Sequence, residues 1–400
     1  MNLSLLQQAP QAYITGHWNT DIHSLLLRKP LFEGITQIEL AQQLESKKKC
    51  HSKLPLWFHT PQIYYPPKQS IEQSSSEATA QYKAGLVSGN NLLDLTGGFG
   101  VDSYYMSKQF QQGVHCEFNS ELSQIAEHNF KVLGATNLQC NAIDGLQFLE
   151  DSRINFDTIY LDPSRRDAQR GRVFLLEDCV PQLPLHLDAL FRNCNTVLLK
   201  TAPLLDLSKG IAQLSGVQAI HIVAVNNEVK ELLWLLQKGY DGPISLIAAH
   251  LHTNKAATDI FTFKREEETD VVSHFDEPQA FLYEPNTAIL KAGAFKLVGQ
   301  RYGVRKLHPH SHLYTSDTLV AFPGRRFKVE RVWPYHKKTL KKLGIAQANV
   351  SCRNFPESVA TLRKKLGLKD GGATYLFFTT DKANQKIMVQ CTKVPKDRAT

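Results

Sequence analysis

Residues 94–100 read Asp-Leu-Thr-Gly-Gly-Phe-Gly, a glycine-rich stretch between two segments of different residue spacing. An apolar segment, 91–95, leads into this stretch, and a segment with helical spacing, 101–108, follows it. Glycine is needed where the backbone turns sharply between a strand and a helix and passes close to a ligand. The stretch therefore predicts the first strand, loop and helix of a doubly wound α/β sheet, with a cofactor bound at the loop.

Beyond this loop, short apolar runs alternate with helical stretches, which is typical of a parallel sheet flanked by helices. We expect seven strands, at residues 91–95, 113–117, 138–141, 156–161, 196–200, 219–224 and 244–249. We expect six helices between them, at residues 101–108, 122–133, 145–149, 180–191, 207–214 and 229–236. Their number and order predict a seven-stranded, Rossmann-like sheet.

The chain is too long for one domain, since 400 residues correspond to about two to four units. Polar helical spacing predicts an N-terminal helical region, and the strand and helix alternation stops near residue 252. We expect four parts: the helical region at 1–70, the sheet domain at 71–255, a small α+β unit at 275–324 and a basic α+β domain at 325–396. The last part is expected to contain a basic helix at 336–343, a helix at 356–366 and a hairpin of 374–379 with 386–393.

Composition narrows the class of protein. The apolar fraction of 42% and the charged fraction of 21% are those of a globular protein. The longest apolar runs, such as 232–236, are too short to cross a bilayer, and the N-terminus lacks a secretory signal, so we expect a cytoplasmic protein. The seven cysteines have no paired spacing, so neither a disulfide framework nor a metal site is expected.

Charge is distributed unevenly along the chain. Residues 291–400 contain 23 Lys and Arg against 6 Asp and Glu, although the formal net charge of the whole chain is only +8. A basic module suits a polyanion, and nucleic acid is the commonest one in the cytoplasm. The alternative is a basic surface that is merely solvated. We predict RNA as the partner.

The glycine loop resembles motif I of class I methyltransferases, which usually reads D-x-G-x-G-x-G. Gly98 and Gly100 stand on motif positions, and Thr96 replaces the first glycine. A dinucleotide site is the alternative, because residues 98–103 come within one residue of G-x-G-x-x-G. The acidic residues nearby are needed to choose between the two cofactors.

Three acidic residues lie at the ends of successive predicted strands. Asp94 lies immediately before the glycines, where it would repel a pyrophosphate, and Glu117 ends the second strand, where an acid can accept both ribose hydroxyls of either cofactor. Asp144 follows the third strand, where the methyltransferases place the residue that contacts the adenine amine. These acids favour the cationic S-adenosylmethionine. Ser76, in a Ser- and Glu-rich turn, is a further candidate for its methionine end, with a helix N-cap as the alternative.

Asp162-Pro163-Ser164-Arg165 ends the fourth predicted strand, which abuts the transferable methyl in class I enzymes. It resembles the D/N-P-P-Y/F/W motif of amine methyltransferases, in which the carboxylate and the proline carbonyl orient the amine and the ring stacks on the base. Arg165 or Arg166 could replace the ring or hold a phosphate. We therefore predict Asp162, Pro163 and Arg165 as the catalytic residues. Lys200 could also line the site, although a lysine at a strand end is more often solvated.

Carbon methylation of a pyrimidine would need a cysteine nucleophile. Cys179 falls in a predicted helical stretch and Cys194 precedes the fifth strand, so neither follows a proline at a strand end. This route is discounted.

Over residues 70–395 the chain resembles a bacterial family of class I S-adenosylmethionine-dependent methyltransferases with a THUMP-like C-terminal domain. The resemblance is carried by DLTGGFGVD (94–102), EQSSSEATAQYKA (72–84), DPSRRD (162–167), EPNTAILKAGAF (284–295), HLYTSD (312–317), FPGRRF (322–327), RNFPE (353–357) and LRKKLGLKDGG (362–372). It implies a ferredoxin-like unit at 281–324 and then a THUMP-like fold. By analogy with RNA-binding THUMP domains, it implies rRNA or tRNA as the substrate.

The last domain is predicted to present a basic face. Its members are Arg325, Arg326, Lys328, Lys337, Lys338, Lys341, Lys342, Arg363, Lys364 and Lys365. Aromatic residues among them could stack on bases or pack in the core; they are Phe327, Trp333, Tyr335 and Phe355. The prediction is a methyltransferase of a base in structured RNA. Two alternatives stay open: a small-molecule or protein methyltransferase, and a non-catalytic RNA-binding protein that retains the cofactor fold.

Overall fold

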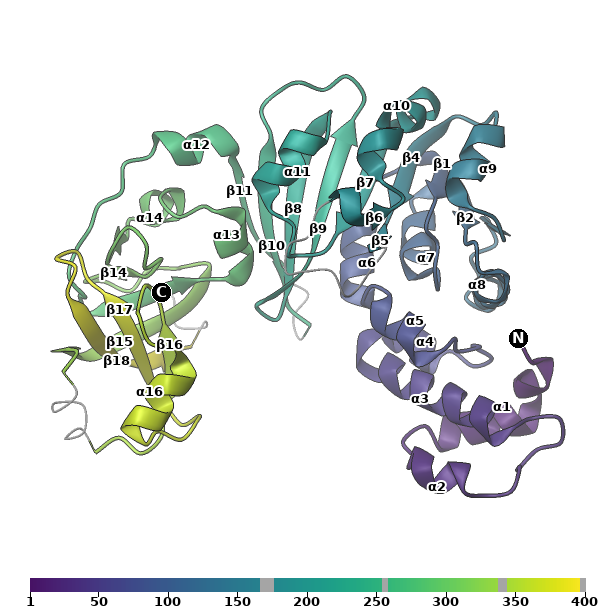
Figure 1. Cartoon of the computed structure of the whole chain (residues 1–400), viewed down its shortest axis with the longest axis horizontal. Coiled ribbons are helices and arrows are strands. Elements are labelled where there is room, and N and C mark those ends of the chain that lie inside the picture. Colours follow the sequence, from purple (N-terminus) through teal and green to yellow (C-terminus); the bar gives the residue numbers. More distant parts are fainter. Residues whose placement is uncertain (166–175, 254–257, 337–343, 396–400) are drawn as a thin grey trace. The chain divides into compact units, whose positions relative to one another are not determined.

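The computed structural model describes residues 1–165, 176–253, 258–336 and 344–395 (Figure 1). The chain separates into two compact units. The first contains residues 1–220 and 231–242, and the second contains residues 221–230 and 243–400. The finer boundaries at 70, 255, 275 and 324 stay a prediction.

The first unit begins with the helical region that the polar spacing predicts. Its helices are η1 (Leu3–Leu6), α1 (Gln8–Gly16), α2 (Ile22–Leu26), α3 (Gln37–Lys53), α4 (Pro55–His59), α5 (Lys68–Gln73) and α6 (Glu77–Ala84). A capping box of Thr36 and Glu39 starts α3, the longest of them. The side chain of Asn129 exchanges two 2.9 Å hydrogen bonds with the backbone of Tyr64, and this joins the helical region to α8 (Ser120–Val132).

A nine-stranded sheet has the order β11-β10-β8-β9-β7-β4-β1-β2-β3. Its strands are β1 (Gly89–Asp94), β2 (Phe110–Cys116), β3 (Leu138–Asn141), β4 (Phe156–Leu161), β7 (Cys194–Thr201), β8 (Val217–Val225), β9 (Glu228–Gln237), β10 (Ser245–Leu251) and β11 (Thr258–Lys264). The pairs from β3 to β7 are parallel, and β9 runs antiparallel to β7. The predicted α/β class is confirmed, and the carboxyl ends of the parallel strands lie along one edge.

The prediction of a helix at 229–236 is wrong, because this segment forms β9. The run Leu232, Leu233, Trp234 is fully buried, and Leu236 is buried too. β9 has a strand on each side, and both faces of the sheet are covered here, so consecutive residues of the strand are buried. The spacing of such an apolar run does not distinguish a buried strand from a buried helix. The sheet also extends beyond the predicted seven strands, since β11 was not expected.

Five helices connect the strands where the sequence predicts them: α7 (Val101–Ser107), α8, α9 (Gly145–Asp151), α10 (Leu183–Asn193) and α11 (Leu207–Gln213). The predicted start of α10 at residue 180 is wrong. Cys179 and Val180 instead form β6, which pairs with β5 (Ser164–Arg165) in a separate two-stranded ladder. Cys179 is therefore in a short strand that follows η2 (Leu176–Asp178) and not in a helix.

The second unit contains a seven-stranded sheet with the order β13-β14-β12-β15-β18-β17-β16. Its strands are β12 (Phe281–Pro285), β13 (Arg305–Lys306), β14 (Tyr314–Ser316), β15 (Gly324–Pro334), β16 (Asn349–Cys352), β17 (Thr374–Thr380) and β18 (Lys386–Val394). The described helices of this unit are α12 (Arg265–Asp270), α13 (Thr287–Ala292), α14 (Leu297–Arg301) and α16 (Val359–Leu366).

One core cluster joins strands from both ends of the second unit, since Leu282 and Leu313 pack with Phe327, Phe377 and Val389. The predicted hairpin is confirmed as the antiparallel pair β17 and β18, and the predicted helix is confirmed with a start at Val359 after the N-cap Ser358. The predicted basic helix falls on 337–343, outside the described residues. No helix in the described parts of the chain is both long and apolar enough to cross a membrane.

Candidate active site at the carboxyl edge of the parallel strands

The loop from Asp94 to Gly100 is held closed by its own hydrogen bonds. Asp94 ends β1 with its side chain buried, and its carboxylate accepts hydrogen bonds from the Thr96 backbone N–H, at 3.0 Å, and from the Ser103 hydroxyl. Gly98 and Gly100 have φ angles of +56° and +85°, a region that favours glycine. The predicted motif glycines are thus required by the backbone conformation of the loop.

Gly97 is needed for a different reason, which the motif comparison did not reveal. A Cβ atom built on Gly97 would lie 2.2 Å from Nε2 of His115. The His115 ring is fully buried beneath the loop, packs edge-on against Phe130, and has its pKa lowered to about 4 by burial. The loop therefore rests directly on a neutral ring, with no room for a side chain at residue 97.

Burial also changes the acidity of Asp94. Removal from water raises the pKa of its carboxyl to about 7, although the hydrogen bonds from Ser103 and Thr96 act in the opposite direction. A cation beside Asp94 would favour the ionised form. The loop can therefore accept positive charge close to neutral pH.

The two other predicted acids follow the neighbouring strands β2 and β3. Glu117 is buried, and its two carboxylate oxygens accept the backbone N–H groups of Gly98, at 2.9 Å, and Asn119, at 2.8 Å. Asp144 is exposed and caps α9 through the N–H of Leu146, at 2.9 Å. The sheet order thus brings Asp94, Glu117 and Asp144 to the same edge, with Glu117 bound directly to the glycine loop.

Two residues near β3 add to this edge and were not predicted. Gly145 approaches the loop so closely that a Cβ would lie 2.3 Å from the carbonyl oxygen of Leu95. The Nδ2 atom of Asn141, at the end of β3, is buried without a hydrogen-bond partner among the described residues. A buried donor of this kind is costly unless a ligand or water satisfies it, so Asn141 is a candidate ligand contact.

Ser76 acts as a helix cap in the structure, because its hydroxyl accepts the N–H of Thr79 at 3.3 Å. Its role as a cofactor contact stays a prediction. The neighbouring Ser75 reaches further into the sheet domain: its hydroxyl donates to Asp102 at 2.7 Å and accepts from the ammonium group of Lys83 at 3.0 Å. The turn that the sequence singles out is therefore connected to the site through Ser75.

A buried ionic cluster, consisting of Lys83, Asp102, Glu231 and Tyr160, lies behind the loop. Lys83 on α6 is completely buried and forms hydrogen bonds of 2.6 and 2.8 Å with the carboxylate of Glu231 on β9. Asp102 on α7 lies 3.3 Å from the same ammonium group and accepts the Tyr160 hydroxyl at 2.7 Å. Although burial opposes its charge, Lys83 and Lys200 lower the pKa of Asp102. The cluster holds α6 and α7 against the sheet.

The predicted acceptor segment is joined to the glycine loop. The backbone N–H of Asp162 donates to the hydroxyl of Thr96 at 2.7 Å, and Pro163 is buried beside it. Thr96 therefore links the loop to the segment that the sequence predicts for methyl transfer. The backbone of Arg165 lies in β5, while its side chain and the whole of Arg166 are outside the described residues.

Lys200 lies near the end of β7, a position at which a lysine is usually solvated, but here its side chain is largely buried. Its ammonium group binds a carboxylate oxygen of Asp162, and its side chain is only 13% exposed, whereas that of Asp162 is 34% exposed. Burial by itself would lower the pKa of Lys200. The negative charges of Asp162, Asp102 and Glu231 have the larger effect, so the pKa of this lysine is raised. The predicted acceptor segment therefore has a carboxylate and an ammonium group side by side.

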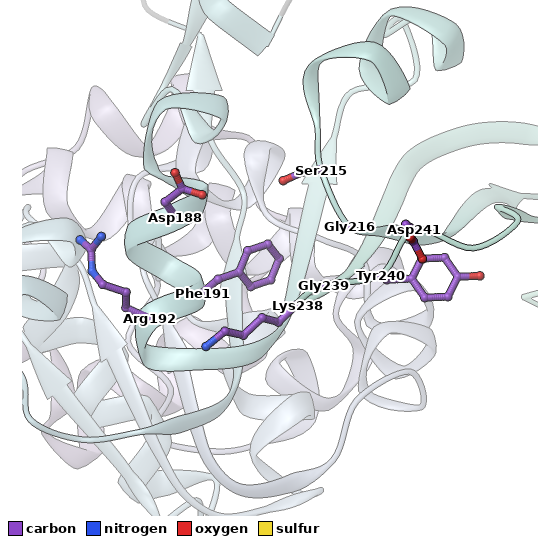
Figure 2. A pocket seen from close by; sticks show the side chains of 9 residues that line it. All are labelled: Asp188, Phe191, Arg192, Ser215, Gly216, Lys238, Gly239, Tyr240 and Asp241. Carbon is purple, nitrogen blue, oxygen red and sulfur yellow. The ribbon is translucent and has the colours of Figure 1, made fainter.

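A cavity of about 490 Å³ in the first unit is separate from this edge (Figure 2). It is lined by Asp188, Phe191, Arg192, Ser215, Gly216, Lys238, Gly239, Tyr240 and Asp241. Lys238 follows the end of β9, and Gln237 pairs with Thr196 at the beginning of β7. The cavity thus lies at the amino ends of the parallel strands, away from the edge where such sheets bind cofactors.

In the second unit, His250, His252 and Asp259 bring their ligand atoms within 4.8 Å of one another. Nε2 of His250 accepts the backbone N–H of Asn227 at 2.8 Å, so the neutral ring carries its proton on Nδ1, the nitrogen that lies 3.7 Å from Asp259. His252 Nε2 lies 2.9 Å from the same carboxylate. In this tautomer Nδ1 of His250 could ligate a metal only after losing its proton.

The predicted basic face is only partly available to a partner. Arg325 and Arg353 bind the buried carboxylate of Glu284, while Arg326 is itself buried. Arg363 pairs with Asp370, and Lys365 pairs with Glu357. Lys328 and Lys364 are exposed. The four other predicted members, Lys337, Lys338, Lys341 and Lys342, lie outside the described residues.

The aromatic residues of this domain face its core. Phe327 is fully buried. Trp333, Tyr335 and Phe355 are partly buried against a second core cluster around Leu362 and Phe378. Of the two roles that the sequence left open, stacking on bases and packing in the core, the structure shows packing in the core.

Comparison with known proteins agrees with this architecture. Residues 281–323 match a ferredoxin-like domain family, and residues 324–393 match a THUMP domain-like family. The chain is 34% identical to a "putative methyltransferase" from Porphyromonas gingivalis W83, whose crystal structure superposes with a TM-score of 0.86 over 99% of this chain and 100% of that one.

More distant similarity extends to proteins of two Mycobacterium tuberculosis strains, CDC 1551 and H37Rv. Each is named an uncharacterized S-adenosylmethionine-dependent methyltransferase, and each is 23% identical over 315 residues, or 75% of this chain and 80% of the relative. The chain belongs to the bacterial family of the Porphyromonas gingivalis protein, in which a methyltransferase-type sheet is combined with ferredoxin-like and THUMP-like domains.

Proposed function

We propose that the protein is an S-adenosylmethionine-dependent methyltransferase that modifies a base of structured RNA, rRNA or tRNA. The observation that carries this proposal is the 2.7 Å hydrogen bond from the Asp162 backbone to the Thr96 hydroxyl. It joins the glycine loop, where a class I enzyme holds the methyl donor, to the segment where such an enzyme holds the acceptor. Donor and acceptor are thus presented to each other at one edge of the sheet.

The residues at this edge fit the methyl donor. Cβ atoms at residues 97 and 100 would meet the rings of His115 and Phe130, so the glycines let the loop pack closely on these side chains and keep its other side clear for a ligand. Asp94 would take the cationic methionine end, Glu117 the ribose hydroxyls, and Asp144 with Asn141 the adenine. When bound, S-adenosylmethionine supplies an electrophilic methyl group. The family relatives that carry its name support this assignment.

Support for RNA comes from the second unit. Its THUMP-like domain belongs to the part of the chain with 23 basic and 6 acidic residues, and Lys328 and Lys364 are exposed on it. Such a domain would bind the phosphate backbone and present a base to Asp162 and Pro163, with Arg165 as the third proposed catalytic residue. A small-molecule or protein methyltransferase would not need this charge to bind its substrate.

Two measurements test the proposal. Calorimetry should detect S-adenosylmethionine binding to the full chain, with at least tenfold weaker binding after Asp94→Ala or Glu117→Arg; unchanged binding in both variants would refute the cofactor assignment. Mass spectrometry of RNA nucleosides from a deletion strain should then show one methylated nucleoside missing. An unchanged nucleoside profile, together with no affinity for RNA at low salt, would refute the RNA assignment.

A further inference from the structure

The acceptor site contains a pair of opposite charges that an amine methyltransferase does not need. Lys200 on β7 and Asp162 after β4 are neighbours because these two strands pair in parallel, with Leu199 opposite Leu161. The ammonium group occupies one oxygen of Asp162, and the other oxygen accepts no hydrogen bond among the described residues. With 34% of its side chain exposed, Asp162 is open to an acceptor, and Lys200 has further N–H groups to donate.

Charge development argues against an exocyclic amine as the acceptor. When a neutral amine attacks a methyl group, positive charge builds on its nitrogen in the transition state. Because Lys200 already neutralises Asp162, the pair gives little stabilisation to that positive charge. A base in which negative charge develops on a neighbouring oxygen would instead be stabilised by Lys200.

We infer that the acceptor is a ring nitrogen that carries a proton and adjoins a carbonyl, as in N1 of guanine or N3 of uracil. Such a base presents an N–H donor beside a C=O acceptor, which complements the carboxylate of Asp162 beside the ammonium group of Lys200. This inference rests on the proposed function and specifies its substrate class. Lys200 becomes a fourth catalytic residue, because it touches the carbonyl of the base.

The step balances without any further reactant. The ring N–H proton passes to the free oxygen of Asp162, and the negative charge that this leaves on the base is spread to the carbonyl oxygen, where Lys200 donates a hydrogen bond. The nitrogen lone pair forms the bond to the methyl carbon while the sulfur–carbon bond breaks, and the bonding electrons remain on sulfur. Asp162 then releases its proton to water.

The product identifies the acceptor directly. The purified full chain is incubated with S-adenosylmethionine and with RNA from a deletion strain, and the nucleosides are analysed by mass spectrometry. 1-Methylguanosine or 3-methyluridine is expected. An N-methylated exocyclic amine, such as N6-methyladenosine, would overturn the inference while leaving the proposed function intact. No methylated nucleoside at all, despite S-adenosylmethionine binding, would refute the proposed function and the inference with it.

Kinetics of three variants test the roles of the pair. Lys200→Met should lower kcat by about 100-fold or more, as loss of one electrostatic donor does, while Lys200→Arg should retain at least a tenth of the wild-type rate. The Asp162→Asn variant should turn over slowly at neutral pH, because it lacks the base that removes the ring proton. Its rate should rise about tenfold per pH unit up to pH 9, as the ring N–H loses its proton to solvent. A pH-independent rate in Asp162→Asn is the result that an amine acceptor would produce.

Correct folding is verified in the same experiment. S-adenosylmethionine affinity should stay within about twofold of wild type in Lys200→Arg and Asp162→Asn, since neither residue is assigned to the cofactor. A variant that binds the cofactor normally but has lost turnover has lost a catalytic group. Full turnover in Lys200→Met with normal cofactor binding would contradict the role assigned to this lysine.

Discussion

Individual residues at the cofactor edge are placed where their ordinary chemistry is altered. Asp94 is an acid without access to water, and His115 is a base without access to water, and each is held in its neutral form over a wider pH range than usual. Both lie at the glycine loop. The loop thus contains no fixed charge of its own until a ligand or a rise in pH ionises Asp94.

Asp94 should make the stability of the protein depend on pH. Its folded-state pKa, about 7, lies above the unfolded value of about 3.9, so the native state keeps a proton that the unfolded chain has lost. Its contribution to the free energy of unfolding is therefore largest below about pH 4 and declines by about 1–4 kcal/mol as the pH rises to 7. Urea unfolding of wild type and Asp94→Asn at pH 5 and pH 8 measures this. The prediction would be contradicted if wild type and Asp94→Asn differed in free energy of unfolding by the same amount at pH 5 and at pH 8.

Gly97→Ala should damage the loop although its backbone φ is not positive. The new methyl group would overlap the buried His115 ring, which cannot move because Phe130 packs against it. We expect a loss of about 1–3 kcal/mol in stability and at least tenfold weaker S-adenosylmethionine binding, measured by thermal unfolding and calorimetry. Gly16→Ala is the matched control, because nothing lies within 4 Å of its added Cβ: cofactor binding should stay unchanged and stability should not fall.

At the scale of elements, the position of α6 depends on one ion pair with β9. The ammonium group of Lys83 and the carboxylate of Glu231 are 148 residues apart in sequence, and the two side chains are 0% and 3% exposed. Burying two charges is expensive, and their mutual contact offsets that cost only while both are present. The main effect of the pair is therefore to fix the position of α6 against β9. Its net contribution to the free energy of unfolding is small.

Removing one partner should be worse than removing both. Lys83→Met leaves Glu231 charged and buried, which should lower the free energy of unfolding by about 3–5 kcal/mol. The double variant Lys83→Met/Glu231→Leu should recover only part of that loss, because Asp102 still lacks the ammonium group of Lys83. Urea denaturation of the full chain measures both proteins. An additive loss in the double variant would show that the two side chains act independently.

At the scale of the whole molecule, the unequal distribution of charge should determine binding to RNA. Lys328 on β15 and Lys364 on α16 are exposed members of the predicted basic face in the described part of the THUMP-like domain. The arginines of that face are largely committed to internal partners such as Glu284 and Asp370. Exposed lysines are therefore the groups to test for contact with phosphate.

Lys328→Glu/Lys364→Glu should weaken binding of structured RNA about tenfold at low salt. Each lost phosphate contact should also reduce the slope of log affinity against log salt concentration by about one. Filter binding over a salt series measures both effects. Lys209→Glu, at an exposed lysine on α11 in the first unit, is the control with the same kind of charge change. Because the control reverses one charge and the test variant two, a loss in the control of about half that size on a logarithmic scale would mean that only net charge matters.

The local features of this protein were determined by its sequence alone. The strand, glycine loop and helix from 89 to 107, the N-cap at Ser76 and the β17–β18 hairpin depend on neighbouring residues, so spacing and residue type predict them. The positions of Asp94, at the end of β1, and of Glu117, directly after β2, are likewise predicted from local spacing. Only the tertiary structure decided which distant residues meet.

Sheet order made 229–236 a strand, because a buried position between β7 and β8 accepts an apolar run that a helix would also accept. Sheet order also placed Lys200 beside Asp162 and Lys83 beside Glu231. Such pairs arise from strand and helix packing over long sequence separations, which no local pattern encodes. The glycine loop that we propose as the donor site can therefore be predicted from the sequence, whereas the Lys200–Asp162 pair that we propose to select the acceptor appears only in the fold.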